Sequence, residues 1–324
     1  MNRTVLRLAC IAASLALVAC EDIRPPRSAY KHDRVEVERE PPTAGATGGV
    51  PQDGQPAAKT AGFVPPDHDD IPEGPFGDMV RRGRDIFVDT GTHAPEFVGN
   101  GLSCGNCHID AGLLPDSAPL WGAWGRYPAY RSKNQHVNNF QERLQGCFRY
   151  SMDGTPPEQG DEVLVALETY AFWMAQGVPV GAAMEGAGYA KDFEPPEPPD
   201  YARGEQVYAE NCALCHGGNG EGQQVAGKYV FPPLWGGDSF NWGAGMHQLD
   251  NAAGFIKANM PLGRGNTLSD QQAWDVAMYM NAHERPQDPR YTGDLAETRA
   301  KFHDSPHSLY GLEVDGRLLG QGAQ

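Results

Sequence analysis

The five-residue pattern C-x-x-C-H occurs twice in this chain of 324 residues, at 104–108 and at 212–216. This spacing is the attachment signature of c-type haem, because two thiols about one helical turn apart add to the two vinyl groups of one porphyrin. The adjacent histidine then binds the iron. A structural zinc site or a redox cysteine pair is the alternative for a single C-x-x-C. Two complete motifs instead predict two covalent haems, attached through Cys104, Cys107, Cys212 and Cys215, with His108 and His216 as iron ligands.

The first 20 residues have the features of an export signal. Arg3 and Arg7 accompany an apolar run over 6–19, which is shorter than the roughly 20 apolar residues of a membrane-spanning helix. The run ends in Leu-Val-Ala-Cys and resembles the lipobox of bacterial lipoproteins, in which Cys20 carries the lipid. A plain signal peptide cut near the same place is the alternative. Both predict export to the periplasm, and the lipobox adds attachment to a membrane through a lipid anchor.

Proline-rich stretches divide the mature chain. The segment after Cys20 is rich in Pro, Gly and charged residues and has no apolar periodicity, as in a flexible tether. A second stretch, Phe-Glu-Pro-Pro-Glu-Pro-Pro-Asp, reads as a stiff linker. The expected organisation is a signal peptide over 1–20, a tether over 21–73, a first haem module over 74–192, the linker over 193–200, a second haem module over 201–285 and a polar tail over 286–324.

The two halves repeat one order of features: a helix, the C-x-x-C-H motif, a loop, a candidate second iron ligand and a terminal helix. Ser269 and Gln272 form a capping box that opens the last of these helices. Apolar spacing and helix-start signals predict helices over 79–89, 137–145, 161–175, 202–210 and 269–281. The predicted fold is mostly α, with two tandem modules similar to class I cytochrome c.

The net charge of −16 narrows the classes of partner. Nucleic-acid binding requires a basic face, so we expect no nucleic acid to bind. An acidic surface suits docking of a basic redox protein that accepts or donates electrons. Simple solubility explains the same charge equally well.

One cysteine is left over when the others are assigned. Cys10 leaves with the signal, Cys20 is the candidate lipid site and four cysteines hold haem, so Cys147 has no disulfide partner. It is either a buried inert thiol or a haem-iron ligand. Met152 is the alternative ligand in this module. In the second module Met260, within Met-Pro as in class I cytochrome c, is the favoured ligand and Met246 is its rival.

The stretch around Cys147 resembles the thiosulfate dehydrogenase family of di-haem cytochromes and, more distantly, the haem subunit of sulfur-oxidising complexes. The resemblance runs from about residue 83 to 285 and includes residues 98–100, 127–131, 142–144 and 231–236. It implies that two thiosulfates are joined into tetrathionate at the first haem, with His108 and Cys147 as its catalytic ligand pair. It further implies that His216 and Met260 hold a second haem, which passes electrons to an external acceptor.

The sequence departs from the family pattern near this chemistry. The family motif C-x-x-R-S-M-N-G has Tyr150 here in place of its Arg and Asp153 in place of its Asn. Two thiosulfate dianions require cationic groups at the haem face. The candidates to supply them, each of which is otherwise a solvated surface charge, are Arg126, Arg131, Lys133, Arg143 and Arg149.

The departures leave two further hypotheses open. The protein is alternatively a non-catalytic di-haem electron carrier, or the cytochrome subunit of a larger periplasmic dehydrogenase. Cys147 favours the enzyme, whereas Tyr150 and Asp153 favour the other two. Some family members exchange the distal Met for a neighbouring Lys; Asn259 occupies that position here, so we expect no such exchange.

Overall fold

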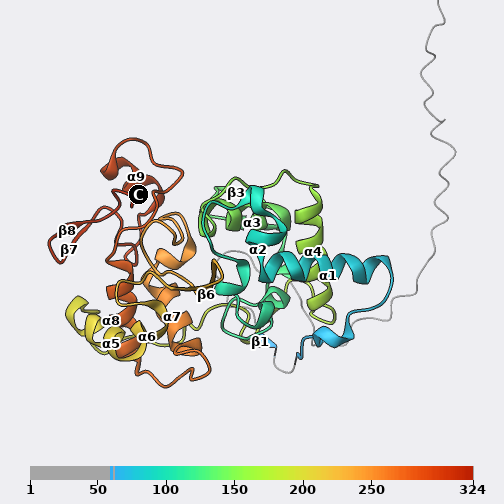
Figure 1. Cartoon of the computed structure of the whole chain (residues 1–324), viewed down its shortest axis with the longest axis horizontal. Helices are drawn as coiled ribbons and strands as arrows, with labels where there is room; N and C mark the ends of the chain where they lie inside the picture. The colour runs from blue at the N-terminus through green and yellow to red at the C-terminus, as the bar shows by residue number, and fades with distance from the viewer. Residues whose placement is uncertain (1–58, 61–62, 324) are drawn as a thin grey trace, which may run out of the picture. The chain divides into compact units, whose positions relative to one another are not determined.

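The computed structural model describes residues 59–60 and 63–323 (Figure 1). The expected signal peptide, Cys20 and most of the expected tether lie outside these residues. None of the helices within the described ranges is long and apolar enough to cross a membrane.

The first module is built on a pair of helices, α1 (Pro75–Val88) and α4 (Glu162–Met174). Asp161 caps α4 by accepting a hydrogen bond from the Val163 amide at 2.8 Å. The apolar positions at helical spacing in α4 are all buried, which confirms the helix; they are Leu164, Leu167, Ala171 and Met174. A Cβ atom at Gly83 would lie 2.1 Å from the carbonyl oxygen of Ala166, so the absence of a side chain there lets the two helices touch backbone to backbone.

The second module repeats this pair with α5 (Tyr201–Asn211) and α8 (Asp270–Asn281). Its contact residue is Gly204, where a Cβ would lie 2.0 Å from the carbonyl oxygen of Asp275. The predicted capping box is present: Ser269 Oγ accepts from the Gln272 amide at 3.1 Å, and Gln272 Oε1 accepts from the Ser269 amide at 2.9 Å. The internal repeat inferred from sequence therefore extends to helix packing.

The remaining elements are short. The other α-helices are α2 (Thr90–His93), α3 (Phe140–Gly146), α6 (Ala213–His216), α7 (Leu249–Asn259) and α9 (Leu295–Phe302). Single turns are η1 (His68–Asp70), η2 (Pro95–Phe97), η3 (Cys104–Asn106), η4 (Asp110–Gly112), η5 (Leu120–Gly122), η6 (Trp124–Arg126), the π-helical η7 (Cys147–Ser151) and η8 (Gly245–His247).

Strands occur as two-stranded pairs. β1 (Lys59–Thr60) runs parallel to β4 (Ala183–Met184). Antiparallel pairs join β2 (Ala129–Arg131) to β3 (His136–Asn138), β5 (Gln223–Val225) to β6 (Lys228–Phe231) and β7 (Glu313–Val314) to β8 (Arg317–Leu318). The β2–β3 pair corrects the helix predicted over 137–145, because residues 137 and 138 belong to β3. That helix, α3, begins only at Phe140, because the Asn139 side chain caps it by accepting from the Glu142 amide at 2.8 Å.

The expected tether ends earlier than residue 73. The ring of Phe63 lies 5.5 Å from that of Trp121, measured between centroids. His68 Nε2 lies 2.9 Å from the Tyr170 hydroxyl. Residues 63–73 therefore pack on the first module, and the predicted boundary was wrong because a few isolated anchoring side chains give no apolar periodicity.

The C-terminal segment, residues 286–324, was expected to be a polar tail laid over the surface. Instead it carries α9 and the β7–β8 hairpin, which Figure 1 shows beside the second module. Its Tyr310 is fully buried and its ring centroid is 5.6 Å from that of Trp242. Its Asp288 and His303 are both buried, and His303 Nε2 lies 2.9 Å from Asp288 Oδ2 in a hydrogen bond. The segment was misjudged because its core is aromatic and polar rather than aliphatic.

Candidate haem sites

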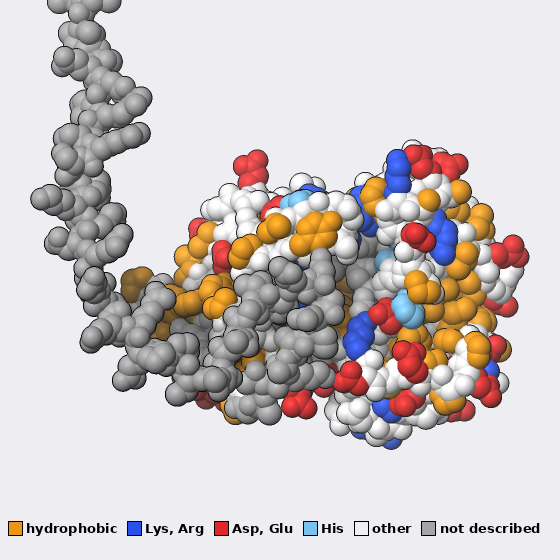
Figure 2. All heavy atoms as spheres, turned by 180° about the vertical axis from the view of Figure 1, so that it is seen from behind, with side chains coloured by type: hydrophobic (Ala, Val, Ile, Leu, Met, Phe, Trp, Pro, Cys, Tyr) orange, Lys and Arg blue, Asp and Glu red, His pale blue; other side chains and the backbone are white. Residues whose placement is uncertain are grey.

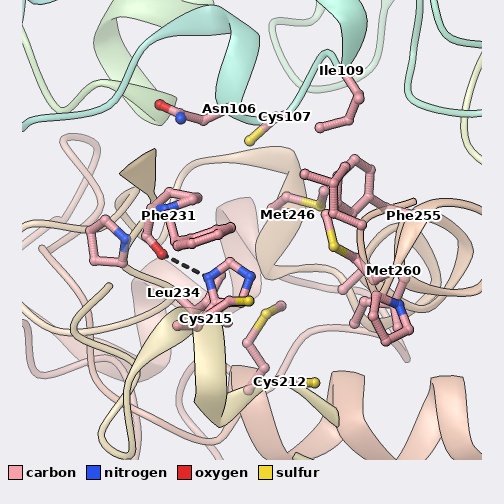
Figure 3. Close-up of a pocket in the computed structure, with 18 of the residues that line it drawn as sticks. Asn106, Cys107, Ile109, Cys212, Cys215, Phe231, Leu234, Met246, Phe255 and Met260 are labelled. Carbon is pink, nitrogen blue, oxygen red and sulfur yellow. Dashed lines mark hydrogen bonds between the residues drawn. The ribbon is translucent and has the colours of Figure 1, made fainter. Parts of the chain in front are cut away.

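The larger cavity lies in the second module and has a volume of about 220 Å³. Cys212, Cys215 and His216 line it, together with both candidate methionines, Met246 and Met260. Figure 3 shows Cys212 and Cys215 on one side of this space and Asn106, Cys107 and Ile109, which belong to the first module, on another. The remaining wall is largely apolar, as a porphyrin requires.

A smaller cavity of about 100 Å³ lies in the first module. Its walls include Cys104, Cys107 and His108 of the first motif, and both candidate second ligands, Cys147 and Met152. The fold therefore brings each predicted ligand to the same cavity as its C-x-x-C-H motif, although in neither module does position alone choose between the two candidates.

Both motif histidines are oriented by a backbone carbonyl. His108 Nδ1 lies 2.6 Å from the Ala118 oxygen, and His216 Nδ1 lies 2.9 Å from the Pro232 oxygen. A hydrogen bond at Nδ1 leaves Nε2 as the free nitrogen, which is the arrangement of metal-binding histidines. Burial lowers the pKa of His108 to about 4, so this imidazole is held in the neutral form that binds iron.

These residues satisfy the requirements of c-type haem. Every cysteine within the described ranges is free of disulfide bonds, so both thiols of each motif are available for attachment. Each cavity combines two thiols, a neutral oriented imidazole and at least one sulfur donor from a distant part of the chain. Zinc is not favoured, because no group of three or more Cys, His, Asp or Glu side chains within the described ranges is placed to hold a metal ion.

The two cavities share part of their walls. Leu102 and Cys107 line both of them. Leu102 is only 3% exposed, so the partition it forms is dry. A cysteine of the first motif thus faces the site of the second, which places the two redox centres on opposite sides of a thin apolar wall.

Cys147 begins the π-helical turn η7, directly after α3. Arg143, one turn earlier, donates a hydrogen bond from Nη1 to Cys147 Sγ at 2.9 Å and lines the same cavity. Negative charge on Cys147 raises the pKa of Arg143, which therefore stays protonated. The first cavity accordingly holds a fixed cation beside its sulfur donor.

Comparison with known proteins agrees with this architecture. Residues 95–180 match the family model "SoxA/TsdA, cytochrome c domain", and residues 199–280 match "Cytochrome C oxidase, cbb3-type, subunit III". Thiosulfate dehydrogenase from Thiomonas intermedia is 58% identical over 80% of this chain and 83% of its own length. The enzyme of the same name from Stutzerimonas stutzeri is 54% identical over 83% of this chain and 90% of its own. The chain belongs to the thiosulfate dehydrogenase family.

The family assignment extends to a solved structure. "Thiosulfate dehydrogenase (TsdBA)" from Marichromatium purpuratum, in its as-isolated form, superimposes with a TM-score of 0.77 at 53% identity. The match covers 81% of this chain and 58% of that one, so this chain spans less than two thirds of the solved polypeptide. The predicted fold class is confirmed: the protein is a di-haem c-type cytochrome with two tandem cytochrome c modules and two covalently bound haems.

The five basic residues that the sequence offered as candidates to bind an anionic substrate lie in different places in the structure. Arg143 lines the first cavity. Lys133 lies outside it, with Nζ 3.6 Å from the centroid of the Tyr150 ring and bonded to the Gly243 carbonyl. Arg126, Arg131 and Arg149 are exposed on the surface. Sequence reasoning thus named one cation at the cavity among several that lie elsewhere.

The position of the family's exchanging Lys is also resolved. Asn259 is buried, and its Nδ2 donates to the carbonyls of Asp116 and Phe255, each at 3.0 Å. The nearby Lys257 pairs with Asp270 at 2.8 Å and donates to the Leu268 carbonyl. Its ammonium is therefore held by Asp270 and Leu268, and Lys257 is not among the residues that line the second cavity.

Sequence reasoning missed residues that act across the two modules. Leu102 lies on both cavity walls, and Asn241 of the second module bonds to the turn that carries Cys147. Neither stands in a ligand motif. The only available signal was that Asn241 lies in a Gly- and Trp-rich loop that no helix or haem motif explains.

Proposed function

We propose that this protein is an oxidoreductase that joins two thiosulfate ions through a new sulfur–sulfur bond. The balanced reaction is 2 S₂O₃²⁻ → S₄O₆²⁻ + 2 e⁻, in which the terminal sulfurs are oxidised and no proton is released. The observation that carries the proposal is the Arg143–Cys147 contact at the wall of the first cavity. It supplies positive charge where an anionic substrate must approach a sulfur-ligated metal site.

We assign the residues of the two sites as follows. Cys104 and Cys107 attach the first haem, with His108 and Cys147 as its iron ligands. Cys212 and Cys215 attach the second haem, with His216 and Met260 as ligands. Bound haem supplies one-electron oxidation and reduction at each site. A thiolate ligand lowers the potential of its site and a thioether raises it, which favours electron flow from the first module to the second.

The chain's own groups prepare the first site for an anion. Arg143 offers N–H donors and a permanent charge at the cavity. The buried wall excludes water, which strengthens that charge. Ala118 holds His108 in a single tautomer. Of the other candidate basic residues, Lys133 is close enough to interact electrostatically with Arg143 and Cys147. The three exposed arginines contribute at most by attracting the anionic substrate toward the protein.

The organisation and the location complete the proposal. We assign residues 63–192 to the first module, 193–200 to the linker and 201–285 to the second module, with residues 286–323 packed against it. We further propose that residues 1–20 direct export to the periplasm and that Cys20 carries a lipid anchor. Electrons leave to a separate redox protein. Figure 2 shows acidic side chains scattered over the surface in that view, which suits a basic acceptor.

A non-catalytic electron carrier is the second candidate. It is favoured by Tyr150 and Asp153, which stand where the family has Arg and Asn. Burial raises the pKa of Asp153, and Asn241 Nδ2 donates to its Oδ1 at 2.7 Å. Its carboxyl is thus engaged by the second module, so it does not simply add negative charge at the cavity. This weakens the case for a carrier.

The deciding experiment is thiosulfate-dependent reduction of the purified di-haem protein, with ferricyanide as acceptor and tetrathionate quantified. We expect one tetrathionate for every two electrons delivered. Intact haems that dithionite reduces but thiosulfate does not, with no turnover in the reverse direction either, would leave the carrier as the correct function.

A further inference from the structure

The turn that carries Cys147 is held by residues from outside its own module. We call residues 147–153 the ligand turn. Its first five residues form the π-helix η7, in which the Met152 amide donates to the Cys147 carbonyl at 3.1 Å. Single π-turns are rare and intrinsically marginal, and they persist where surrounding contacts support them. The π-turn η7 therefore depends on contacts from other parts of the chain.

Asn241, in the second module, makes several of them. Its Nδ2 donates to the Arg149 carbonyl at 2.9 Å and to Asp153 Oδ1 at 2.7 Å. Its backbone amide donates to the Tyr150 carbonyl at 3.1 Å. Asn241 is completely buried, so removing its side chain costs the two Nδ2 bonds in a site shielded from solvent, while the backbone bond to Tyr150 remains.

A second support comes from the C-terminal segment. The Arg290 guanidinium carbon lies 5.1 Å from the centroid of the Tyr150 ring, and Lys133 Nζ lies 3.6 Å from it. Tyr150 is only 7% exposed. Cations at this range are attracted to the ring face, more strongly when the pair is shielded from water. The side chain that replaces the family's Arg is thus a docking point for the Arg290 guanidinium and for the Lys133 amine, whose pKa burial lowers to about 7.

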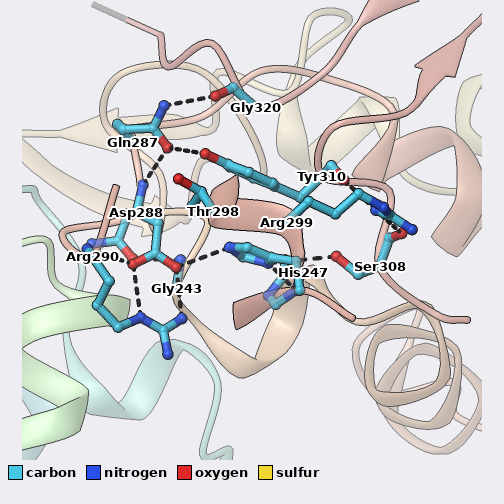
Figure 4. Close-up of polar contacts among 12 residues, drawn as sticks. Gly243, His247, Gln287, Asp288, Arg290, Thr298, Arg299, Ser308, Tyr310 and Gly320 are labelled. Atoms are coloured by element: carbon cyan, nitrogen blue, oxygen red, sulfur yellow. Dashed lines mark hydrogen bonds and ion pairs between the residues drawn. The ribbon is translucent and has the colours of Figure 1, made fainter. Parts of the chain in front are cut away.

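Arg290 is itself fixed in place. Its Nη2 lies 2.6 Å from Asp288 Oδ2 and its Nε lies 3.0 Å from Asp288 Oδ1. The same carboxylate accepts from His303 Nε2 at 2.9 Å. Figure 4 shows Arg290 reaching the carboxylate of Asp288. A guanidinium clamped on two oxygens has little freedom to move, so its contact with Tyr150 is well defined.

We propose that Asn241 and Arg290 are positioning residues for Cys147: they hold the ligand turn so that its sulfur stays in the first cavity. This inference rests on the proposed role of Cys147 as an iron ligand. It adds that the first haem site is completed by the second half of the chain. Neither residue touches the reacting atoms; each acts through Tyr150 or the turn's carbonyl groups.

The test uses the full-length di-haem protein and the variants Asn241→Ala and Arg290→Gln. The readouts are the ferric low-spin thiolate signature and the reduction potential of the first haem. We expect each variant to lower the ratio of thiolate-ligated to unligated ferric sites about tenfold, with the second haem unchanged. Arg290→Lys keeps a cation near Tyr150 and should restore most of the signature, which a purely structural loss would not predict.

The matched control is Asn251→Ala. Asn251 Nδ2 also donates to a backbone carbonyl of the second module, that of Gly245, at 2.8 Å, but Asn251 does not hydrogen-bond to the ligand turn. A folded Asn241→Ala or Arg290→Gln protein with the parent signature and potential overturns the proposal, as does an equal disturbance of both haems. Should Asn241→Ala fail to fold, Arg290→Gln and its Lys rescue decide alone.

The Cys147→Ala variant distinguishes the positioning role from the proposed role of Cys147 as an iron ligand. If Cys147→Ala leaves the parent spectrum unchanged, the ligand assignment is wrong and the positioning role is refuted with it. If Cys147→Ala removes the signature but Asn241→Ala and Arg290→Gln do not, only the positioning role is refuted.

Discussion

Arg143 and Cys147 face each other across one helical turn, with Nη1 2.9 Å from Sγ. The i, i+4 spacing of α3 places both on one side of the chain, although Cys147 already belongs to the π-turn that follows. Charge and sulfur donor thus come from a single short segment, and their relative position is set locally. What the rest of the molecule must supply is the placement of that segment against the first haem.

Removing the cation should impair the use of an anionic substrate more than it impairs folding. We expect Arg143→Gln to lower kcat/KM for thiosulfate by about 10- to 100-fold, the usual range for losing one charge-assisted hydrogen bond. The matched control is Arg131→Gln, because Arg131 is exposed on β2; we expect it to change kcat/KM less than about twofold. Equal effects of the two substitutions would argue against a specific role for Arg143.

Removing the sulfur of Cys147 should alter one haem only. We expect the ferric spectrum of Cys147→Ala to lose its low-spin thiolate features while the second haem keeps its own, because Cys147 lines only the first cavity. Met152→Leu is the control for the rival donor and should leave the thiolate features in place. A Cys147→Ala spectrum identical to that of the parent would exclude this ligand.

The choice between the two methionines of the second cavity can be made in the same way. We expect Met260→Ala to abolish the weak near-infrared sulfur–iron band and to lower the potential of the second haem, since a thioether ligand stabilises ferrous iron. Met246→Ala should retain the band. If the two results are exchanged, Met246 is the ligand and Met260 is part of the wall.

The two helix contacts at Gly83 and Gly204 should be intolerant of any side chain. A Cβ would lie 2.1 Å from a backbone oxygen at the first and 2.0 Å at the second, so Ala must push the helices apart. We expect Gly83→Ala and Gly204→Ala each to lower the free energy of unfolding by about 1–3 kcal/mol, measured by urea denaturation. Gly91→Ala is the control, because nothing lies within 4 Å of its Cβ position; a similar loss there would refute the packing argument.

The buried Asp288 should confer stability that is lost in acid. Burial opposes its ionisation, but hydrogen bonds from His303 and Arg290 outweigh burial and hold the pKa of Asp288 well below its ordinary value of 3.8. A carboxyl with a lowered pKa stabilises the folded state above its ordinary pKa, and this stabilisation declines as the pH falls below 3.8.

We therefore expect Asp288→Asn to reduce the free energy of unfolding at pH 7. Below about pH 4, we expect the free energy of unfolding of the variant to fall less steeply with decreasing pH than that of the parent. Glu297→Gln is the comparison, since Glu297 pairs with Lys301 on the exposed face of α9. Denaturation series at several pH values give the slopes. A parent and an Asp288→Asn variant with parallel pH profiles would contradict the assignment.

Much of the fold could be read from the sequence because its strongest signals are local. The C-x-x-C-H motifs, the capping box at Ser269 and the apolar spacing of α4 each depend on residues a few positions apart. They predicted the two modules, the haem sites and most helices. The start of α3 was missed because Val137 was included in the helix, whereas it lies in β3, ahead of the Asn139 cap.

What could not be read is the part that depends on contacts between distant segments. The packing of residues 286–323 rests on a hydrogen bond between Asp288 and His303 and on the stacking of His303 with Tyr310, whose ring centroids are 4.0 Å apart. Polar and aromatic residues at irregular spacing carry no periodic signal. For the same reason the sequence indicated only the loss of a cation at Tyr150, whereas the fold places Arg290 and Lys133 against the face of its ring.

The partition made of Leu102 and Cys107 has a consequence for how such a protein can change over generations. A substitution that reshapes one cofactor pocket at this wall also reshapes its neighbour, so the two redox centres cannot drift apart independently. A substitution at this wall that changes the reduction potential of one haem must also leave the other haem site intact. Tolerated substitutions should therefore occur mainly at residues that line only one of the two cavities, and rarely at Leu102 or Cys107.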